Sequence, residues 1–293
     1  MFLTKKTSRR IFVKDLALLT SASMLPGFAF ANYKETKMKL GLVTYLWGKD
    51  WDVPTLIKNC SAAKVYGVEL RVEHAHGVEP SITEARRKEV KKTFADSPVK
   101  IVGLGTNQQY DFIEPEKLKQ SIERTKEFIK LGADIGGTGV KVKPNGFHKE
   151  VPHEKTIEQI GKALNDVGKF GADHGQKIRL EVHGAETQEL PNIKAIMDVA
   201  NHPNVYVCWN CNDEDLLGGG LEENFNLVKK KLGDTVHVRE LNIGKYPYQQ
   251  LMDLFVKMDY EGWILLECRT EPVDKVKAMM EQYDVFEMMT KRK

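Results

Sequence analysis

Short apolar runs alternate with longer amphipathic stretches along the chain from Lys39 onward. The short runs are rich in β-branched residues, which is typical of strands, and the longer stretches carry apolar residues at helical spacing. The predicted strands are 40–46, 67–72, 100–104, 139–142, 177–182, 205–209, 235–241 and 262–267. The predicted helices lie near 53–65, 82–95, 115–131, 154–173, 191–201, 221–232, 247–258 and 273–289.

Strict alternation of strands and helices predicts parallel strands joined by right-handed crossovers. Eight such units in about 250 residues match the size of a closed α/β barrel, the (β/α)8 TIM barrel. An open doubly wound sheet is the alternative, but it would place a glycine-rich phosphate turn after an early strand, and residues 40–49 contain none. We therefore expect a single barrel domain over residues 32–293.

The first 31 residues have the features of an export signal. Basic residues precede position 15, an apolar stretch covers 16–30, and Ala29-Phe30-Ala31 is a small-x-small cleavage site. The segment Ser8-Arg9-Arg10-Ile11-Phe12-Val13-Lys14 resembles the twin-arginine export motif. We expect residues 1–31 to be a twin-arginine signal peptide and the protein to be periplasmic. An uncleaved membrane anchor is the alternative.

Composition and charge limit the functions that need to be considered. The chain has Lys+Arg 44 and Asp+Glu 41, a net charge of +3, and removal of residues 1–31 takes away five basic residues and Asp15, which leaves −1. A chain without a basic excess is unlike a nucleic-acid binder. Beyond residue 31 no stretch reaches the roughly 20 apolar residues of a membrane span. Four cysteines are too few for a disulfide scaffold.

Several charged residues stand between apolar neighbours near the carboxyl ends of the predicted strands, where TIM barrels place their active sites. They are Glu69, Arg71, Lys141, Lys143, Glu181, Arg239 and Glu267. A buried charge costs several kcal/mol unless it is paired or bound to a metal. The set therefore predicts a polar pocket, and the alternative is that these residues pair with one another and stabilise the barrel.

Glu181 and Glu267 follow the fifth and eighth predicted strands and can face each other across the barrel mouth. Two opposed carboxylates can remove a proton from a carbon and return it on another face. A divalent cation would stabilise the enolate formed between the two steps. Without a cation, Lys141, Lys143 or Arg239 could supply positive charge.

The chain resembles the xylose-isomerase-like TIM barrels, the sugar phosphate isomerase/epimerase superfamily. The resemblance is carried by Gly67-Val68-Glu69-Leu70-Arg71, Leu180-Glu181-Val182-His183, Val205-Tyr206-Val207-Cys208-Trp209-Asn210, Val236-His237-Val238-Arg239 and Leu265-Leu266-Glu267. It implies the barrel fold over the whole mature chain. The resemblance specifies the activity less closely than the fold, because the superfamily includes isomerases, epimerases, dehydratases and endonucleases.

The resemblance also implies a metal site with Glu, Asp, His and Glu from strands five to eight. Glu181 and Glu267 match the two Glu positions, Asn210 stands where Asp is expected, and Arg239 stands where His is expected, two residues after His237. Arg cannot ligate a cation. The predicted ligands are Glu181, Glu267 and Asn210, for Mn, Mg or Zn. The alternatives are that the metal is lost, or that His183 or Glu240 completes the site.

These observations predict an exported carbohydrate isomerase or epimerase that transfers a proton next to a carbonyl group, without a nucleotide cofactor. Glu181 and Glu267 are the predicted catalytic residues. The predicted substrate-binding residues are Glu69, Arg71, His74, Lys141, Lys143, His183, Asn210 and Arg239. Two alternatives remain open: a lyase or hydrolase acting on keto-glycosides, and a non-catalytic sugar-binding protein with a degenerate metal site. The sequence leaves the oligomeric state undetermined.

Overall fold

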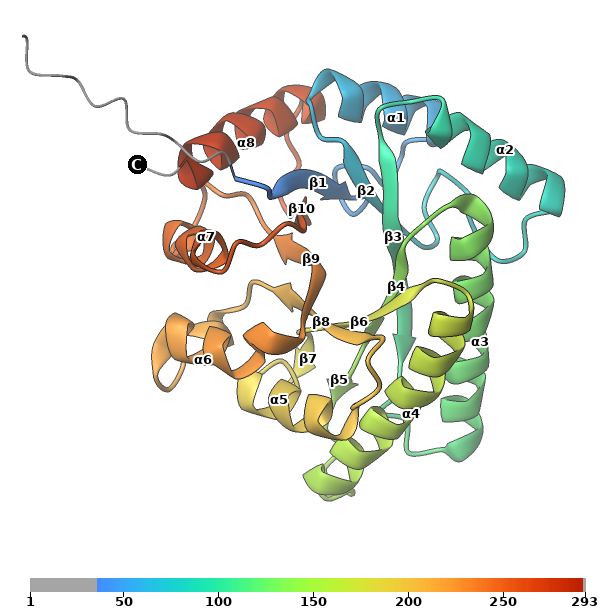
Figure 1. Cartoon of the computed structure of the whole chain (residues 1–293), viewed down its shortest axis with the longest axis vertical. Coiled ribbons are helices and arrows are strands. Elements are labelled where there is room, and N and C mark those ends of the chain that lie inside the picture. Colours follow the sequence, from blue (N-terminus) through green and yellow to red (C-terminus); the bar gives the residue numbers. More distant parts are fainter. Residues whose placement is uncertain (1–35, 292–293) are drawn as a thin grey trace, which may run out of the picture. The chain divides into compact units, whose positions relative to one another are not determined.

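The computed structural model describes residues 36–291, in which eight parallel strands close into a barrel (Figure 1). The strands are β1 (Lys39–Val43), β2 (Gly67–Arg71), β3 (Lys100–Gln109), β4 (Gly139–Lys143), β6 (Lys177–Glu181), β8 (Val205–Asn210), β9 (Leu232–Val238) and β10 (Trp263–Leu266). Around the barrel their order is β1-β10-β9-β8-β6-β4-β3-β2. The predicted TIM barrel is confirmed, because each strand pairs in parallel with neighbours that only a helical crossover can reach.

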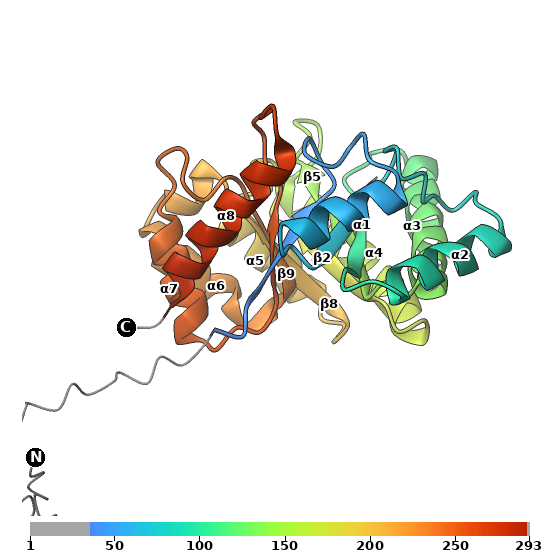
Figure 2. The same ribbon diagram turned by 90° about the horizontal axis from the view of Figure 1, so that it is seen from above.

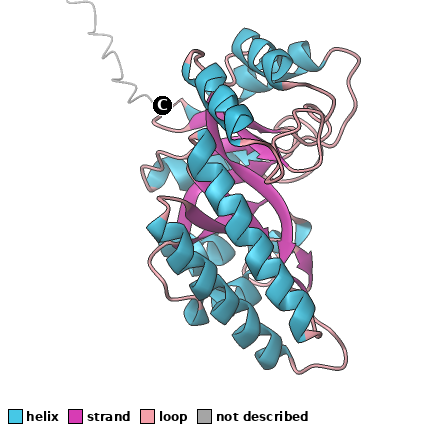
Figure 3. Cartoon of the chain, turned by 90° about the vertical axis from the view of Figure 1, so that its right-hand side faces the viewer, coloured by secondary structure: helices cyan, strands magenta, loops and turns pink. Residues whose placement is uncertain are grey.

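Helices surround the strands on the outside of the barrel (Figure 3). They are α1 (Val53–Ala62), α2 (Glu84–Ala95), α3 (Pro115–Ile135), α4 (His153–Asp173), α5 (Leu190–Val199), α6 (Gly220–Val228), α7 (Tyr248–Lys257) and α8 (Lys275–Thr290), with short 3-10 turns η1 (Asp213–Leu216) and η2 (Lys229–Lys231). Side chains of Asp52, Thr83 and Asp274 accept hydrogen bonds from backbone N–H groups in the first turns of α1, α2 and α8. These caps fix where the three helices begin.

The predicted signal peptide at 1–31 lies outside the described residues, so both it and the export route stay predictions. Within residues 36–291, none of the helices combines the length and apolar character needed to cross a bilayer.

The apolar residues form two separate clusters. The large cluster packs the outer faces of the strands against the helices. A small one, built from Val43, Val102 and Leu265, fills part of the barrel interior. Toward the amino ends of the strands, the interior also holds the fully buried Arg179, whose Nε donates to Asp234 Oδ1 at 2.9 Å. An ion pair thus closes one end of the barrel and leaves the carboxyl end for polar side chains.

A second, two-stranded sheet joins two loops at the carboxyl end of the barrel (Figures 1 and 2). Its strands are β5 (Asn145–Gly146) and β7 (Gly184–Ala185), and Asn145 pairs with Gly184 in parallel. This pairing ties the segment after β4 to the segment after β6. It therefore holds Lys143, two residues before β5, and His183, the residue before β7, near each other.

We expect Gly184→Ala to destabilise the protein by more than the approximately 1 kcal/mol that positive φ costs a non-glycine residue. Gly184 has φ +95°, and a Cβ there would overlap the backbone oxygen of Asn145. Gly175→Ala is the matched control, because Gly175 has φ +65° with nothing within 4 Å of the added Cβ. Urea denaturation of both variants measures the difference. Equal decreases in the free energy of unfolding of the two variants would show that the contact with Asn145 is unimportant.

Candidate active site

Six polar side chains from neighbouring strands meet inside the carboxyl end of the barrel. We call them the inner layer: Glu69, Lys141, Glu181, Asn210, His237 and Glu267. Five of them, from β4, β6, β8, β9 and the residue after β10, come from consecutive strands of the barrel. The Glu267 side chain is 12% exposed, and the other five residues are at most 3% exposed. The structure thus brings together the two predicted catalytic acids and three predicted substrate-binding residues, with His237 in addition.

Glu181 is held by three hydrogen-bond donors. Lys141 Nζ donates to its Oε2 at 2.7 Å, and Asn210 Nδ2 donates to its Oε1 at 3.1 Å. His237 Nδ1 lies 3.3 Å from the same Oε1. Burial disfavours the ionised carboxyl, but the charge of Lys141 together with the hydrogen bond and charge of His237 outweighs it and holds the pKa of Glu181 well below its ordinary value. Glu181 is therefore a fixed, ionised group.

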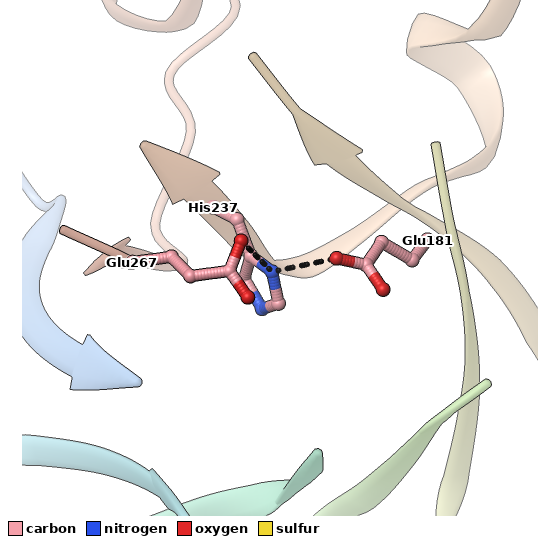
Figure 4. A group of neighbouring side chains, drawn as sticks. All are labelled: Glu181, His237 and Glu267. Atoms are coloured by element: carbon pink, nitrogen blue, oxygen red, sulfur yellow. Dashed lines mark hydrogen bonds and ion pairs between the residues drawn. The ribbon is translucent and has the colours of Figure 1, made fainter. Parts of the chain in front are cut away.

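His237 lies between carboxylates, as Figure 4 shows for Glu181 and Glu267. Its Nδ1 is 3.8 Å from Glu267 Oε2, and its Nε2 is 3.2 Å from Glu69 Oε1. Burial disfavours the charged ring, but the neighbouring Cys208 and Glu69 raise the pKa of His237 well above its ordinary value. The expectation that Arg239 replaces the histidine of the metal site is wrong, since His237 itself fills that place.

Room for Glu69 behind His237 comes from a glycine on the neighbouring strand. A Cβ at Gly105 of β3 would lie 2.6 Å from Glu69 Oε1. Glu69 can therefore reach the imidazole only because position 105 has no side chain.

Glu267 differs from Glu181 in its surroundings. Among the described residues no hydrogen bond reaches its carboxyl group, and its nearest charged neighbour is His237. Burial raises the pKa of Glu267, and the negative charge of Glu181 acts in the same direction. Two carboxyls whose environments push their pKa values apart are suited to different roles in proton transfer.

The inner layer fits a divalent cation. Glu181, His237 and Glu267 each offer one ligand atom, and these atoms lie within 4.8 Å of one another. Glu69 lies 3.2 Å from Nε2, on the side of the ring away from the two acids, which is where carboxylates lie behind metal-binding histidines. The triad could therefore bind Mn, Mg or Zn, and binding would displace the proton of His237. Asn210 presents its amide nitrogen, so its predicted role as a ligand requires the amide to turn over.

The remaining predicted residues lie around this layer. Arg71, Lys143 and His183 are half-buried two positions beyond Glu69, Lys141 and Glu181, and Arg239 is half-buried two positions beyond His237. His74 is half-buried in the loop after β2. Glu240, the alternative ligand, instead accepts hydrogen bonds from the backbone N–H groups of Arg269 and Thr270 and anchors the loop after β10. The roles of Arg71, His74, Lys143, His183 and Arg239 in binding substrate stay predictions.

A buried network that the sequence did not reveal holds the loop after β8 beside the mouth. Tyr246 donates its hydroxyl hydrogen to Asp215 Oδ2 at 2.6 Å, and the backbone N–H of Asn212 donates to the same oxygen. Oδ1 of Asp215 is buried without a hydrogen-bond partner among the described residues. Burial raises the pKa of Asp215 from 3.8 to about 7.

We therefore expect Asp215 to make the protein less stable as the pH rises. Because its folded pKa is higher than its unfolded pKa, the folded state binds the extra proton, and that contribution is lost between about pH 4 and 7. At roughly 1.4 kcal/mol per pKa unit, the effect amounts to at most about 4 kcal/mol. The Tm of Asp215→Asn should equal that of the wild type at pH 4 and be higher than that of the wild type at pH 8. The exposed Asp213→Asn is the control, and parallel Tm curves for Asp215→Asn and wild type would contradict the argument.

The comparisons with known proteins agree with the barrel fold. The sequence model of the xylose isomerase-like TIM barrel family matches residues 57–287. Inosose dehydratase from Histophilus somni (strain 129Pt) is 21% identical over 278 residues, which cover 82% of this chain and 92% of that protein.

Among solved structures, 3-keto-D-glucoside 4-epimerase from E. coli has a TM-score of 0.73 at 12% identity, covering 86% of this chain and 99% of that one. The IolI protein, solved with a zinc atom, has a TM-score of 0.72 at 12% identity, covering 86% of this chain and 98% of that one. At these identities the likeness shows the fold alone.

Proposed function

Because the chain belongs to the xylose isomerase-like TIM barrel family, we propose that it is a carbohydrate isomerase or epimerase that transfers a proton next to a carbonyl group. The observation that carries the proposal is the opposed pair Glu181 and Glu267 in one buried polar layer (Figure 4). A sugar entering the mouth would place its carbonyl group and the neighbouring carbon between these two acids.

Glu267 is the group that begins the reaction. Its carboxylate takes the proton from the carbon next to the carbonyl, the electrons of the C–H bond form a C=C bond, and the carbonyl oxygen becomes an oxyanion. Glu267 suits this step because its carboxyl faces the mouth and is engaged by no hydrogen bond from the described residues.

Positive charge at the floor of the site stabilises the oxyanion. Lys141 and the protonated His237 supply it from this chain, in a buried environment where such charges act strongly. A divalent cation held by Glu181, His237 and Glu267 would polarise the carbonyl oxygen and stabilise the same charge. Epimerisation is completed when the carbon receives a proton on its opposite face through Glu181. The protonated His237, whose Nδ1 is 3.3 Å from Glu181, passes its proton to the Glu181 carboxylate, which gives it to the carbon, and Glu267 then returns the abstracted proton to His237.

Elimination is the second candidate outcome, favoured by the similarity to inosose dehydratase. The first step is the same, but the enolate then expels a leaving group from the next carbon instead of taking up a proton. With a hydroxyl as the leaving group the reaction is a dehydration, and with a glycosidic oxygen it releases the aglycone of a keto-glycoside.

Product analysis separates these outcomes. The purified protein is incubated with D-fructose, D-psicose, L-ribulose and 3-keto-glucosides, with and without Mn²⁺, and the products are followed by proton NMR. We expect epimers or ketose–aldose pairs. An unsaturated ketone or free aglycone would assign a lyase, and saturable binding with no product would assign a non-catalytic sugar-binding protein.

A further inference from the structure

A basic residue follows each acidic or basic member of the inner layer after one intervening position. Arg71 follows Glu69, Lys143 follows Lys141, His183 follows Glu181, Arg239 follows His237 and Arg269 follows Glu267. Arg71 and Lys143 end β2 and β4, and since side chains two apart along a strand share one face, they start about 6.6 Å above the inner layer. The other three follow within one to three residues of the ends of β6, β9 and β10. We call Arg71, Lys143, His183 and Arg269 the upper layer.

Strand pairing brings Arg71 near the residues of β4, because Gly105 of β3 pairs with Arg71 on one side and with Lys141 on the other. Burial lowers the pKa of Lys143, and the charges of Lys141 and Arg71 act in the same direction, against the opposing charges of Glu181 and Glu267. The β5–β7 pairing fixes Lys143 beside His183 from the backbone side. Arg239 instead lies close to Cys211 and Asp215 in the loop after β8.

The cations of the upper layer lack counter-charges. Within residues 36–291, none of Arg71, Lys143 and Arg269 has a carboxylate in ion-pair distance. Arg71 donates only to the amide oxygen of Asn107, at 3.2 Å, and lies 5.1 Å from the ring centre of Tyr45.

Lys143 is half-buried and makes no hydrogen bond to any described residue, and Nδ1 of His183 is likewise buried without a partner. The acids beneath compensate these charges only from a distance, since Glu181 is paired with Lys141, and Glu69 and Glu267 flank His237. A half-buried lysine without a partner is costly in the free protein, and a ligand with a negative charge would relieve that cost.

We propose that the upper layer binds a negatively charged substituent, a carboxylate or a phosphate ester, on the sugar whose carbonyl group lies at the inner layer. This inference rests on the proposed function, and it narrows the substrate to an anionic sugar. The step of two residues between the layers corresponds to a substituent several bonds away from the reacting carbon. Lys143 is the central contact, because Arg71 and Lys141 flank it and His183 lies beside it.

Titration calorimetry with three matched ketoses tests the proposal: D-fructose, D-fructuronate and D-fructose 6-phosphate. They differ only in the group at the end of the chain, which is a hydroxymethyl, a carboxylate or a phosphate ester. Since a charge-assisted hydrogen bond is worth about tenfold in affinity, we expect at least one anion to bind about tenfold tighter than D-fructose. The anion that binds more tightly identifies whether the substituent is a carboxylate or a phosphate ester. Added salt should weaken the binding of the two anions and leave the affinity for D-fructose unchanged.

Lys143→Met should remove most of this preference without lowering Tm, because Met keeps the aliphatic packing and removes an unpaired charge. Lys149→Met, in the exposed loop after β5, is the matched control and should bind all three sugars like the wild type. Equal affinity for D-fructose and both anions, no binding of either anion, or an equal loss for all three in Lys143→Met would overturn the proposal.

The outcome is separable from that of the proposed function. Anion-selective binding without proton exchange in any sugar would support the anion-binding role of the upper layer and contradict the proposed isomerase or epimerase activity. Proton exchange that is equally fast in neutral and anionic sugars would support the proposed activity and contradict the anion-binding role of the upper layer.

Discussion

Glu267→Gln is expected to lower kcat by about 100- to 10,000-fold, the range that a positioned general acid or base contributes. The amide keeps the shape of the side chain but cannot accept the proton from carbon. Because no described residue hydrogen-bonds to the Glu267 carboxyl, the free energy of unfolding should stay close to that of the wild type. Steady-state kinetics on the best substrate and a thermal melt measure both quantities.

Glu181→Gln is the matched comparison. It should also lower kcat, but it should lower Tm as well, because it leaves the Lys141 ammonium buried without its carboxylate. The two variants therefore separate a carboxyl free for proton transfer from one fixed by its neighbours. Activity in Glu267→Gln within a few-fold of the wild type would contradict the role given to Glu267.

Lys141→Met is expected to cause the largest loss of stability. The ammonium of Lys141 is 2% exposed and lies 2.7 Å from Glu181 Oε2. Removing one partner of a buried ion pair costs about 3–5 kcal/mol, because the other charge stays buried without compensation. For a domain of this size the loss corresponds to a decrease in Tm of roughly 6–20 °C.

Three further measurements test whether the loss of stability in Lys141→Met comes from the broken ion pair with Glu181. In the double variant Lys141→Met/Glu181→Gln both charges are gone, so the loss should be smaller than the sum of the single losses. Lys143→Met, two positions along the same strand, should not destabilise. A divalent cation should raise Tm more in Lys141→Met than in the wild type, because it would replace the missing positive charge beside Glu181. Equal effects of Lys141→Met and Lys143→Met would contradict the pairing.

Periodicity alone was enough to predict the fold. Each predicted strand overlaps a barrel strand of the described chain, since buried parallel strands are short apolar runs that helices separate. The two-stranded sheet of β5 and β7 was not predicted, because strands of two residues leave no periodic signal. The helix bounds differ by a few residues, which is ordinary where a terminal turn frays.

The site was predicted in part. Alternation correctly indicated that Glu181, Glu267 and Lys141 share the interior, but it cannot tell one layer from the next along the same face. His237 and Arg239 are separated by one such step, which is why Arg239 was matched to the metal-binding position. A histidine between Val236 and Val238, in phase with Thr235, carried the signal that it points inward. The suggestion that the charges pair with each other is confirmed for Lys141 and Glu181.

Solvent deuterium exchange tests the central claim most directly, namely that Glu267 and Glu181 move a proton at the carbon beside a sugar carbonyl. In D₂O the wild type should introduce deuterium at that carbon of a ketose substrate, detectable by NMR in recovered sugar and product alike. In Glu267→Gln the exchange should fall at least about 100-fold. Bound sugars that take up no deuterium, or exchange in Glu267→Gln at the wild-type rate, would contradict the account.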